Sequence, residues 1–162
     1  MHDKTRASGT RRRHGRTAAF TLVELLIAVA IILTLAAMAV PSLLKAMDIA
    51  RIARAVGEIR TLEDEIALYE SLNDRLPDSL NDIGRGTLLD PWGTPYQYLN
   101  FANVKGKGAM RKDRFLVPLN STYDLYSMGP DRLSQPPLTA KVSRDDIVRA
   151  NDGGFIGPAS AY

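Results

Sequence analysis

Residues 20–44 read FTLVELLIAVAIILTLAAMAVPSLL, and they form the most apolar stretch of the chain. Glu24 is the only charged residue in it, and twenty uncharged residues separate Glu24 from Lys45. At about 1.5 Å per residue, a helix of that length covers about 30 Å, the thickness of the hydrocarbon core of a bilayer. The stretch therefore predicts a transmembrane helix over residues 20–44.

The basic residues are concentrated before this helix. Residues 1–19 contain six Lys or Arg residues and one Asp, whereas the remaining 143 residues contain fifteen basic and seventeen acidic residues. Positive charge before a membrane segment places that end in the cytoplasm. The basic pI of 9.3 thus reflects the first 19 residues. For this reason overall charge gives no indication of a nucleic-acid partner.

The helix is expected to continue past the membrane segment. Between Lys45 and Leu72 apolar residues recur every three or four positions, which predicts an amphipathic helix with one buried stripe. No helix-stop signal appears between Lys45 and Leu72. The predicted stripe consists of Ile49, Ile52, Val56, Ile59, Leu62, Ile66, Tyr69 and Leu72.

Residues 73–162 have the composition of a small α+β head. Asp78 after Pro77 predicts the N-cap of a short helix over residues 79–83 that ends at Gly84. Aromatic and branched residues between Gly and Pro breaks predict an antiparallel sheet packed on the helix stripe. Its predicted strands are residues 96–101, 115–119 and 123–128, and residues 129–162 are predicted to be rich in loops.

The residue types that are absent exclude several kinds of site. The chain has no Cys, and both His residues lie in the basic first 19 residues. Disulfides, thiolate metal sites and most nucleophilic triads are therefore excluded from the head. No pair of acidic residues stands out on an apolar background as general acid and base, so we expect no enzyme.

Two general explanations of the N-terminal region compete with a more specific one. A cleaved signal peptide would have a basic start and a small-residue site such as the one at residues 37–39, but its apolar core is shorter, about 7–15 residues. The second general explanation is an ordinary single-pass membrane anchor. Neither explains Glu24, because a carboxylate in an apolar membrane segment is costly and usually finds a partner. If the chain were cut before Phe20, the new α-amine could pair with Glu24 of a neighbouring copy.

The segment from Ala19 to Glu24 resembles the processing site of type IV prepilins and type II secretion pseudopilins. The resemblance implies that a prepilin peptidase cuts between Ala19 and Phe20 and methylates the new amine. Glu24 is the fifth residue after the cut and Pro41 the twenty-second, as is common in that family. Ala19 departs from the glycine that the family usually has before the cut, but it keeps the small size.

Two segments of the head resemble the major pseudopilins of type II secretion. These segments are residues 89–96, LDPWGTPY, and residues 123–131, YDLYSMGPD. The resemblance implies calcium in the loop that follows, within residues 129–157. Its motif-matched ligand positions are Ser127, Asp131, Asp145 and Asp146.

The composition of this loop is compatible with calcium, which prefers six to eight oxygen ligands. Asp131, Asp145, Asp146 and Asp152, together with Asn151, supply several such oxygens. The alternative is that these are ordinary turn residues, because Asp, Asn and Gly are common in turns for backbone reasons. The basic run over residues 105–114 has two similar explanations: a solvated loop, or a contact with nucleic acid or with an acidic face of a neighbouring subunit.

Taken together, the sequence and its resemblances predict a pseudopilus subunit of the inner membrane, with its N-terminus cytoplasmic and its head periplasmic. The implied partners are further copies in a helical filament, the prepilin peptidase, other pseudopilins and the inner-membrane secretion platform. The role would be mechanical, in protein export. The alternatives are a type IV pilus subunit, which serves adhesion, motility or DNA uptake, and a membrane-anchored calcium-binding module that never polymerises.

We predict that the mature protein begins at Phe20. The residue before it, Ala19, is small, follows a basic leader and precedes the apolar run. The intact mass of the protein isolated from its native host measures this. A species that keeps residues 1–19, or one that begins at Val40 after a signal-peptidase cut, would contradict the pseudopilin interpretation.

Overall fold

The computed structural model describes residues 20–162. The described residues fall into two units, residues 20–42 and residues 43–162. The dominant element is α1, Leu22–Asn73, which includes Pro41. The prediction of one continuous helix through residue 72 is confirmed. This helix is long and apolar enough to cross a membrane, and none of its most apolar section is buried within the chain.

One stripe of α1 forms the core of the head. Its fully buried residues are Ala55, Ile59, Leu62 and Ile66. They follow one another at spacings of three or four residues, as expected for one helix face. The predicted stripe is wrong at its ends, because Ile49 is 68% exposed and Leu72 is 75% exposed. No element of the head covers these two residues.

Four short strands form one antiparallel sheet in the order β1-β2-β3-β4. Each strand pairs with the next one in the sequence, with Leu99 opposite Asp124, Tyr126 opposite Val148, and Val148 opposite Gly157. The strand bounds are β1 Gln97–Asn100, β2 Tyr123–Ser127, β3 Ile147–Ala150 and β4 Phe155–Pro158.

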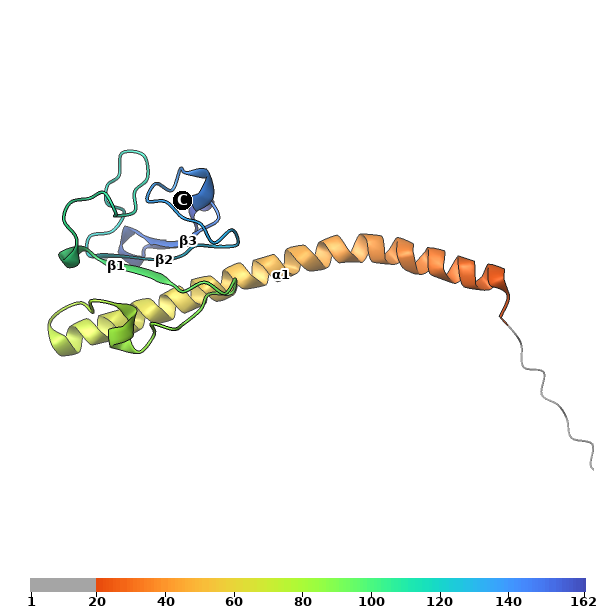
Figure 1. Ribbon diagram of the computed structural model, residues 1–162, viewed down its shortest axis with the longest axis horizontal. Coiled ribbons are helices and arrows are strands. Elements are labelled where there is room, and N and C mark those ends of the chain that lie inside the picture. Colours follow the sequence, from red (N-terminus) through yellow and green to blue (C-terminus); the bar gives the residue numbers. More distant parts are fainter. Residues whose placement is uncertain (1–19) are drawn as a thin grey trace, which may run out of the picture. The chain divides into compact units, whose positions relative to one another are not determined.

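The two faces of the sheet bury different partners. Leu125 and Ile147 belong to the core that contains the α1 stripe. Val148 belongs to a second, smaller cluster with Leu119 and Leu138 from the loops. In Figure 1 α1 lies along one side of the sheet, and the long loops that follow β1 and β2 lie on the other side. One face is thus covered by a helix and the other only by loops.

The segment predicted as a strand over residues 115–119 is not a strand. Asp113 and Leu116 exchange two backbone hydrogen bonds, of 2.7 and 3.0 Å, around a tight turn at Arg114 and Phe115. Pro118 has no N–H to donate to a strand ladder. The aromatic and branched residues of this segment therefore belong to a hairpin and loop.

The loop-rich region contains two strands that the sequence analysis missed, β3 and β4. Arg149 in β3 obscured the strand pattern, because a charged residue in a four-residue strand is unexpected. Its side chain is only 5% exposed. Arg149 Nε donates to Glu63 Oε1 of α1 at 2.8 Å, and the guanidinium lies 4.2 Å from the centre of the Tyr123 ring.

The short helix after α1 begins one residue later than predicted. It is a 3-10 helix, Leu80–Ile83, and Ser79 rather than Asp78 is its N-cap. Asp82 Oδ2 accepts the backbone N–H groups of both Ser79 and Asp78, at 2.9 and 2.8 Å. Gly84 ends the helix as predicted, in a left-handed conformation with φ of 72°.

Candidate functional site

The first candidate site is the N-terminal end of α1. Ala19 and the leader, residues 1–19, lie outside the described residues, whereas Phe20 is described and is 84% exposed. Thr21 and Glu24 cap the helix reciprocally. Thr21 donates to Glu24 Oε2 from its backbone N and its hydroxyl, both at 2.9 Å, and Glu24 N donates to Thr21 Oγ1 at 3.1 Å.

This arrangement is a capping box, a Thr followed three residues later by a Glu at the start of a helix. The sequence analysis missed it, although the Thr-x-x-Glu spacing was visible. Glu24 thus has a local partner, Thr21, in addition to the α-amine of a neighbouring copy that assembly would supply. Thr21 occupies only Oε2, and no residue in the described part of the chain donates to Oε1. The carboxylate therefore keeps one oxygen for a further donor.

The second candidate site begins at Ser127, the last residue of β2. Asp90, in the Asp-Pro-Trp-Gly turn, accepts the backbone N–H groups of Trp92 and Thr94 on Oδ1 at 3.0 and 2.8 Å. Its other oxygen accepts the Ser127 hydroxyl at 2.5 Å, and Ser127 Oγ accepts from Gly129 N at 3.1 Å. The hydroxyl of Ser127 therefore already has two partners within the head, one that it donates to and one that it accepts from.

Asp131 and Asp145 lie together at the start and end of the loop. The backbone N–H of Asp131 donates to Asp145 Oδ2 at 3.3 Å, and Asp131 Oδ1 accepts from Leu133 N at 2.8 Å. Gly129 packs tightly against the backbone of Asp145, because a Cβ on Gly129 would lie 2.4 Å from the Asp145 carbonyl oxygen. Its φ of 66° is also one that residues with side chains rarely adopt.

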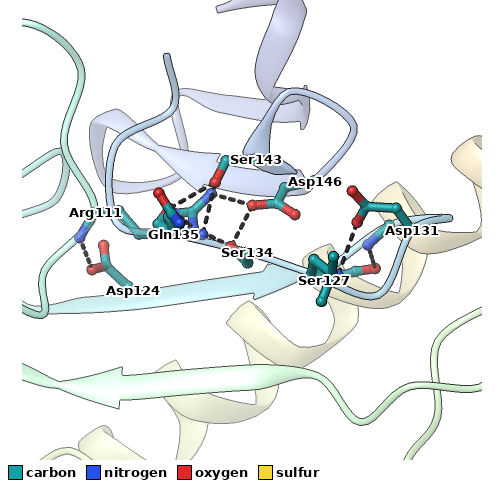
Figure 2. Close-up of polar contacts among 10 residues, drawn as sticks. Arg111, Asp124, Ser127, Asp131, Ser134, Gln135, Ser143 and Asp146 are labelled. Atoms are coloured by element: carbon teal, nitrogen blue, oxygen red, sulfur yellow. Dashed lines mark hydrogen bonds and ion pairs between the residues drawn. The ribbon is translucent and has the colours of Figure 1, made fainter. Parts of the chain in front are cut away.

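Asp146 points to a different partner, the buried Arg111 (Figure 2). Asp146 Oδ2 accepts from Arg111 Nη2 at 2.5 Å and from Ser134 Oγ at 2.6 Å. Arg111 Nη1 donates to Ser134 Oγ and to the Gln135 carbonyl, at 2.5 and 2.7 Å. The guanidinium also lies 4.3 Å from the centre of the Tyr126 ring. Arg111 thus joins the loop to β2 and to the start of β3.

The Arg111–Asp146 pair is almost completely buried, with side-chain exposures of 2% and 0%. Burial raises the pKa of Asp146 to about 6, and the hydrogen bonds from Ser134 and Arg111 counteract this rise. The guanidinium of Arg111 supplies the positive charge that an ionised Asp146 needs in this buried position. Its other oxygen, Oδ1, is buried and has no hydrogen-bond partner among the described residues. A buried carboxylate oxygen without a donor is the kind of atom that a cation satisfies.

The predicted ligands do not converge into one cluster. Among residues 20–162, no three acidic or His side chains lie close enough together to hold a metal ion. Asp152 is engaged elsewhere: its Oδ1 accepts from Ser121 N at 2.8 Å and lies 3.7 Å from Arg149 Nη1. The structure thus brings Asp131 beside Asp145, and places Asp146 next to a fixed positive charge.

Arg111 was missed as a functional residue because it belongs to the basic run over residues 105–114, which looked uniformly solvated. One sequence signal distinguishes it: Met110 and Arg111 interrupt the Gly- and Lys-rich pattern, and both are buried. The backbone N–H of Arg111 also donates to the buried Asp124 Oδ2 at 2.6 Å. The run is therefore one buried anchor followed by an exposed hairpin.

Comparison with known proteins supports the N-terminal end of α1 as a functional site. Residues 15–40 match the family model described as the prokaryotic N-terminal methylation motif. This match spans the expected cut site, the capping box and most of the apolar stretch. No solved structure matches the chain significantly.

Several curated relatives carry the name type II secretion system core protein G. The protein from Aeromonas hydrophila is 31% identical over 106 residues, which are 52% of this chain and 74% of that relative. The protein from Pseudomonas aeruginosa is 29% identical over 69% of this chain and 82% of its own length. The protein from Dickeya chrysanthemi is 29% identical over 88% of this chain and 90% of its own length.

The buried pair predicts a large and specific effect of replacing Arg111. Arg111→Met should lower the free energy of unfolding by about 3–5 kcal/mol, because it leaves the Asp146 carboxylate buried without its cation. Denaturant unfolding of residues 43–162, in the presence of a chelator, measures this. The matched control is Lys105→Met, at an exposed position of the same basic run, which should change stability by no more than about 0.5 kcal/mol. Equal effects of the two substitutions would contradict the anchoring role.

Proposed function

Because the chain belongs to the family of the type II secretion system core protein G, we propose that it works by packing its N-terminal helix against those of further copies. The chain is a structural subunit of the pseudopilus, the filament built from such pseudopilins. Its place in that filament follows from the two halves of α1. The membrane half supplies the assembly surface, and the second half supplies the core of the head.

The observation that carries this proposal is the exposed apolar surface of α1. Every residue from Leu22 to Leu44 is exposed, although most of them are apolar. Such a surface needs lipid or other apolar helices around it. In the membrane, lipid covers it, and in the filament the same surface of neighbouring subunits covers it. The positive residues before the helix favour a cytoplasmic N-terminus and a periplasmic head.

We infer that processing prepares the helix end for assembly. A prepilin peptidase would cut between Ala19 and Phe20 and methylate the new amine, in line with the methylation motif over residues 15–40. The new amine would lie one residue before Thr21, whose N–H already reaches Glu24. Glu24 Oε1 would then accept the amine of a neighbouring subunit, so that each incoming subunit stops at the same axial position.

We also propose calcium as a ligand of the loop between β2 and β3. Asp131 and Asp145, which lie together, and the unpartnered Oδ1 of Asp146 support this proposal. Backbone carbonyls would have to complete the ligand set, that of Ser127 among them. Calcium would neutralise the acidic residues of the loop, while Arg111 independently fixes the Oδ2 side of Asp146.

Two substitutions separate the charge of Glu24 from its capping role. Glu24→Ala should still insert into the membrane, because removal of a carboxylate makes insertion easier. Glu24→Gln keeps an acceptor for Thr21 but loses the charge. We expect both variants to give far fewer filaments than wild type, with normal amounts in the membrane fraction. Normal filament yield in Glu24→Gln would show that only the cap matters and would refute the pairing with the amine.

Calcium should stabilise the head, residues 43–162, because a ligand that binds only the folded state adds about 2.7 kcal/mol at a hundredfold excess over Kd. Each kcal/mol raises the melting temperature of such a domain by about 4–8 °C. Magnesium should act weakly, because it demands tighter octahedral geometry. Asp145→Ala should reduce the shift, whereas Asp113→Ala, in the basic run, should not. Superimposable melting curves with calcium and with chelator would refute the site.

A further inference from the structure

A hairpin in the basic run presents an aromatic residue to solvent. The backbone bonds between Asp113 and Leu116 close a two-residue turn, with Arg114 in a left-handed conformation at φ of 46°. Phe115 at its tip is fully exposed, and Leu116 beside it is 47% exposed. The turn holds a large apolar side chain away from the core of the head. Exposed aromatic residues of this kind are typical anchors of protein interfaces.

The surroundings of Phe115 are positively charged. The hairpin region, defined here as residues 105–116, contains five basic residues and one acidic residue. Arg111 is buried against Asp146, so the exposed charges of the hairpin come from the other basic residues. These are Lys105, Lys107 and Arg114, which are exposed, and Lys112, which is partly buried.

An apolar groove of complementary character lies at the end of α1. Its volume is about 300 Å³, and it is lined by Glu65, Leu68, Tyr69, Leu72, Asn73 and Ile83. Leu68 is 60% exposed and Leu72 is 75% exposed, so their side chains are only partly covered within one copy. Leu72 is one of the two residues for which the head offers no cover.

The segment that forms this groove is strongly acidic. Residues 61–85 contain seven acidic and two basic residues. Both basic residues are already paired inside the segment, Arg85 with Glu65 and Arg75 with Asp78. The remaining acidic charge is opposite in sign to that of the hairpin. An apolar groove with an acidic border therefore matches an apolar tip with basic neighbours.

One copy cannot join these two surfaces. In Figure 1 the loop between β1 and β2, which contains the hairpin, lies on the side of the sheet away from α1, whereas the groove belongs to α1 itself and to the short helix beside it. Two complementary surfaces at different places on one molecule make a head-to-tail contact. Such a contact repeats from copy to copy and, where it does not close a ring, produces a helical filament.

We propose that Phe115 of one subunit inserts into the groove around Leu68 and Leu72 of a second copy, with the basic hairpin facing the acidic border of the groove. The proposal rests on the proposed function, because it supplies a contact between heads in the filament that the N-terminal helices begin. It gives the heads an axial and rotational position that apolar helix packing alone does not specify. An anionic membrane surface is the competing partner for a basic hairpin with an exposed Phe.

Disulfide trapping tests the contact in the full-length chain, expressed with its peptidase and assembly platform. The chain has no Cys, so in a variant with Leu116→Cys and Leu72→Cys, which keeps Phe115, every disulfide joins two introduced residues. Cysteines are joined only when their Cα atoms approach within about 7 Å. Oxidised filaments should give a ladder of linked subunits on a non-reducing gel. The control variant with Leu133→Cys and Leu72→Cys uses another exposed leucine and should give none.

A second measurement keeps the test decisive if the double-cysteine variant does not assemble. Phe115→Ser should lower filament yield at least about tenfold, which corresponds to 1.4 kcal/mol, whereas Leu133→Ser should not. Filaments without a ladder, or normal yield in Phe115→Ser, overturn the contact. Normal filaments together with loss of binding of the Phe115→Ser head to anionic vesicles would assign the hairpin to the membrane instead. If the wild-type chain forms no filaments at all, the proposed function fails rather than this contact.

Discussion

The head depends on the burial of one stripe of α1 against one face of the sheet. Ile59, Leu62 and Ile66 meet Leu125 and Ile147 in a single core. Burying a side chain of this size stabilises a fold by about 1.5–3 kcal/mol, so these few residues account for much of the stability of a small domain. The same stripe fixes the register of the strands, because a slip of one residue would turn their apolar side chains away from the helix.

A buried arginine reinforces the packing on each face of the sheet. On the loop-covered face Arg111 binds Asp146, and on the helix face Arg149 of β3 binds Glu63 of α1. Each guanidinium also lies over a tyrosine ring, Tyr126 and Tyr123 respectively. A buried ion pair gives little net stability compared with apolar packing, but loss of one partner is expensive. These pairs therefore specify where the loops and α1 attach to the sheet more than they add to the total stability.

The sequence predicted α1 because an apolar stretch of membrane length, followed by apolar periodicity up to residue 72, is a strong signal. It missed β3 and β4, where strands of four residues carry Arg149 or Pro158 and show no alternation. Their pairing depends on partners distant in the sequence, such as Glu63, which local patterns do not reveal. The same reason hid Arg111 among basic neighbours. Thr21 and Glu24 are different, because their capping spacing could have been recognised.

The candidate site is thus divided between a helix end that the sequence motif already identified and a loop whose chemistry depends on tertiary contacts. Residues 20–44 are the common requirement, since both anchoring and assembly use their exposed apolar side chains. Electron cryo-microscopy of the assembled filament tests this claim most directly. The account predicts that residues 20–44 of neighbouring subunits contact one another along the filament axis, with the heads outside. A filament held together by head contacts alone, with residues 20–44 outside the subunit interfaces, would contradict it.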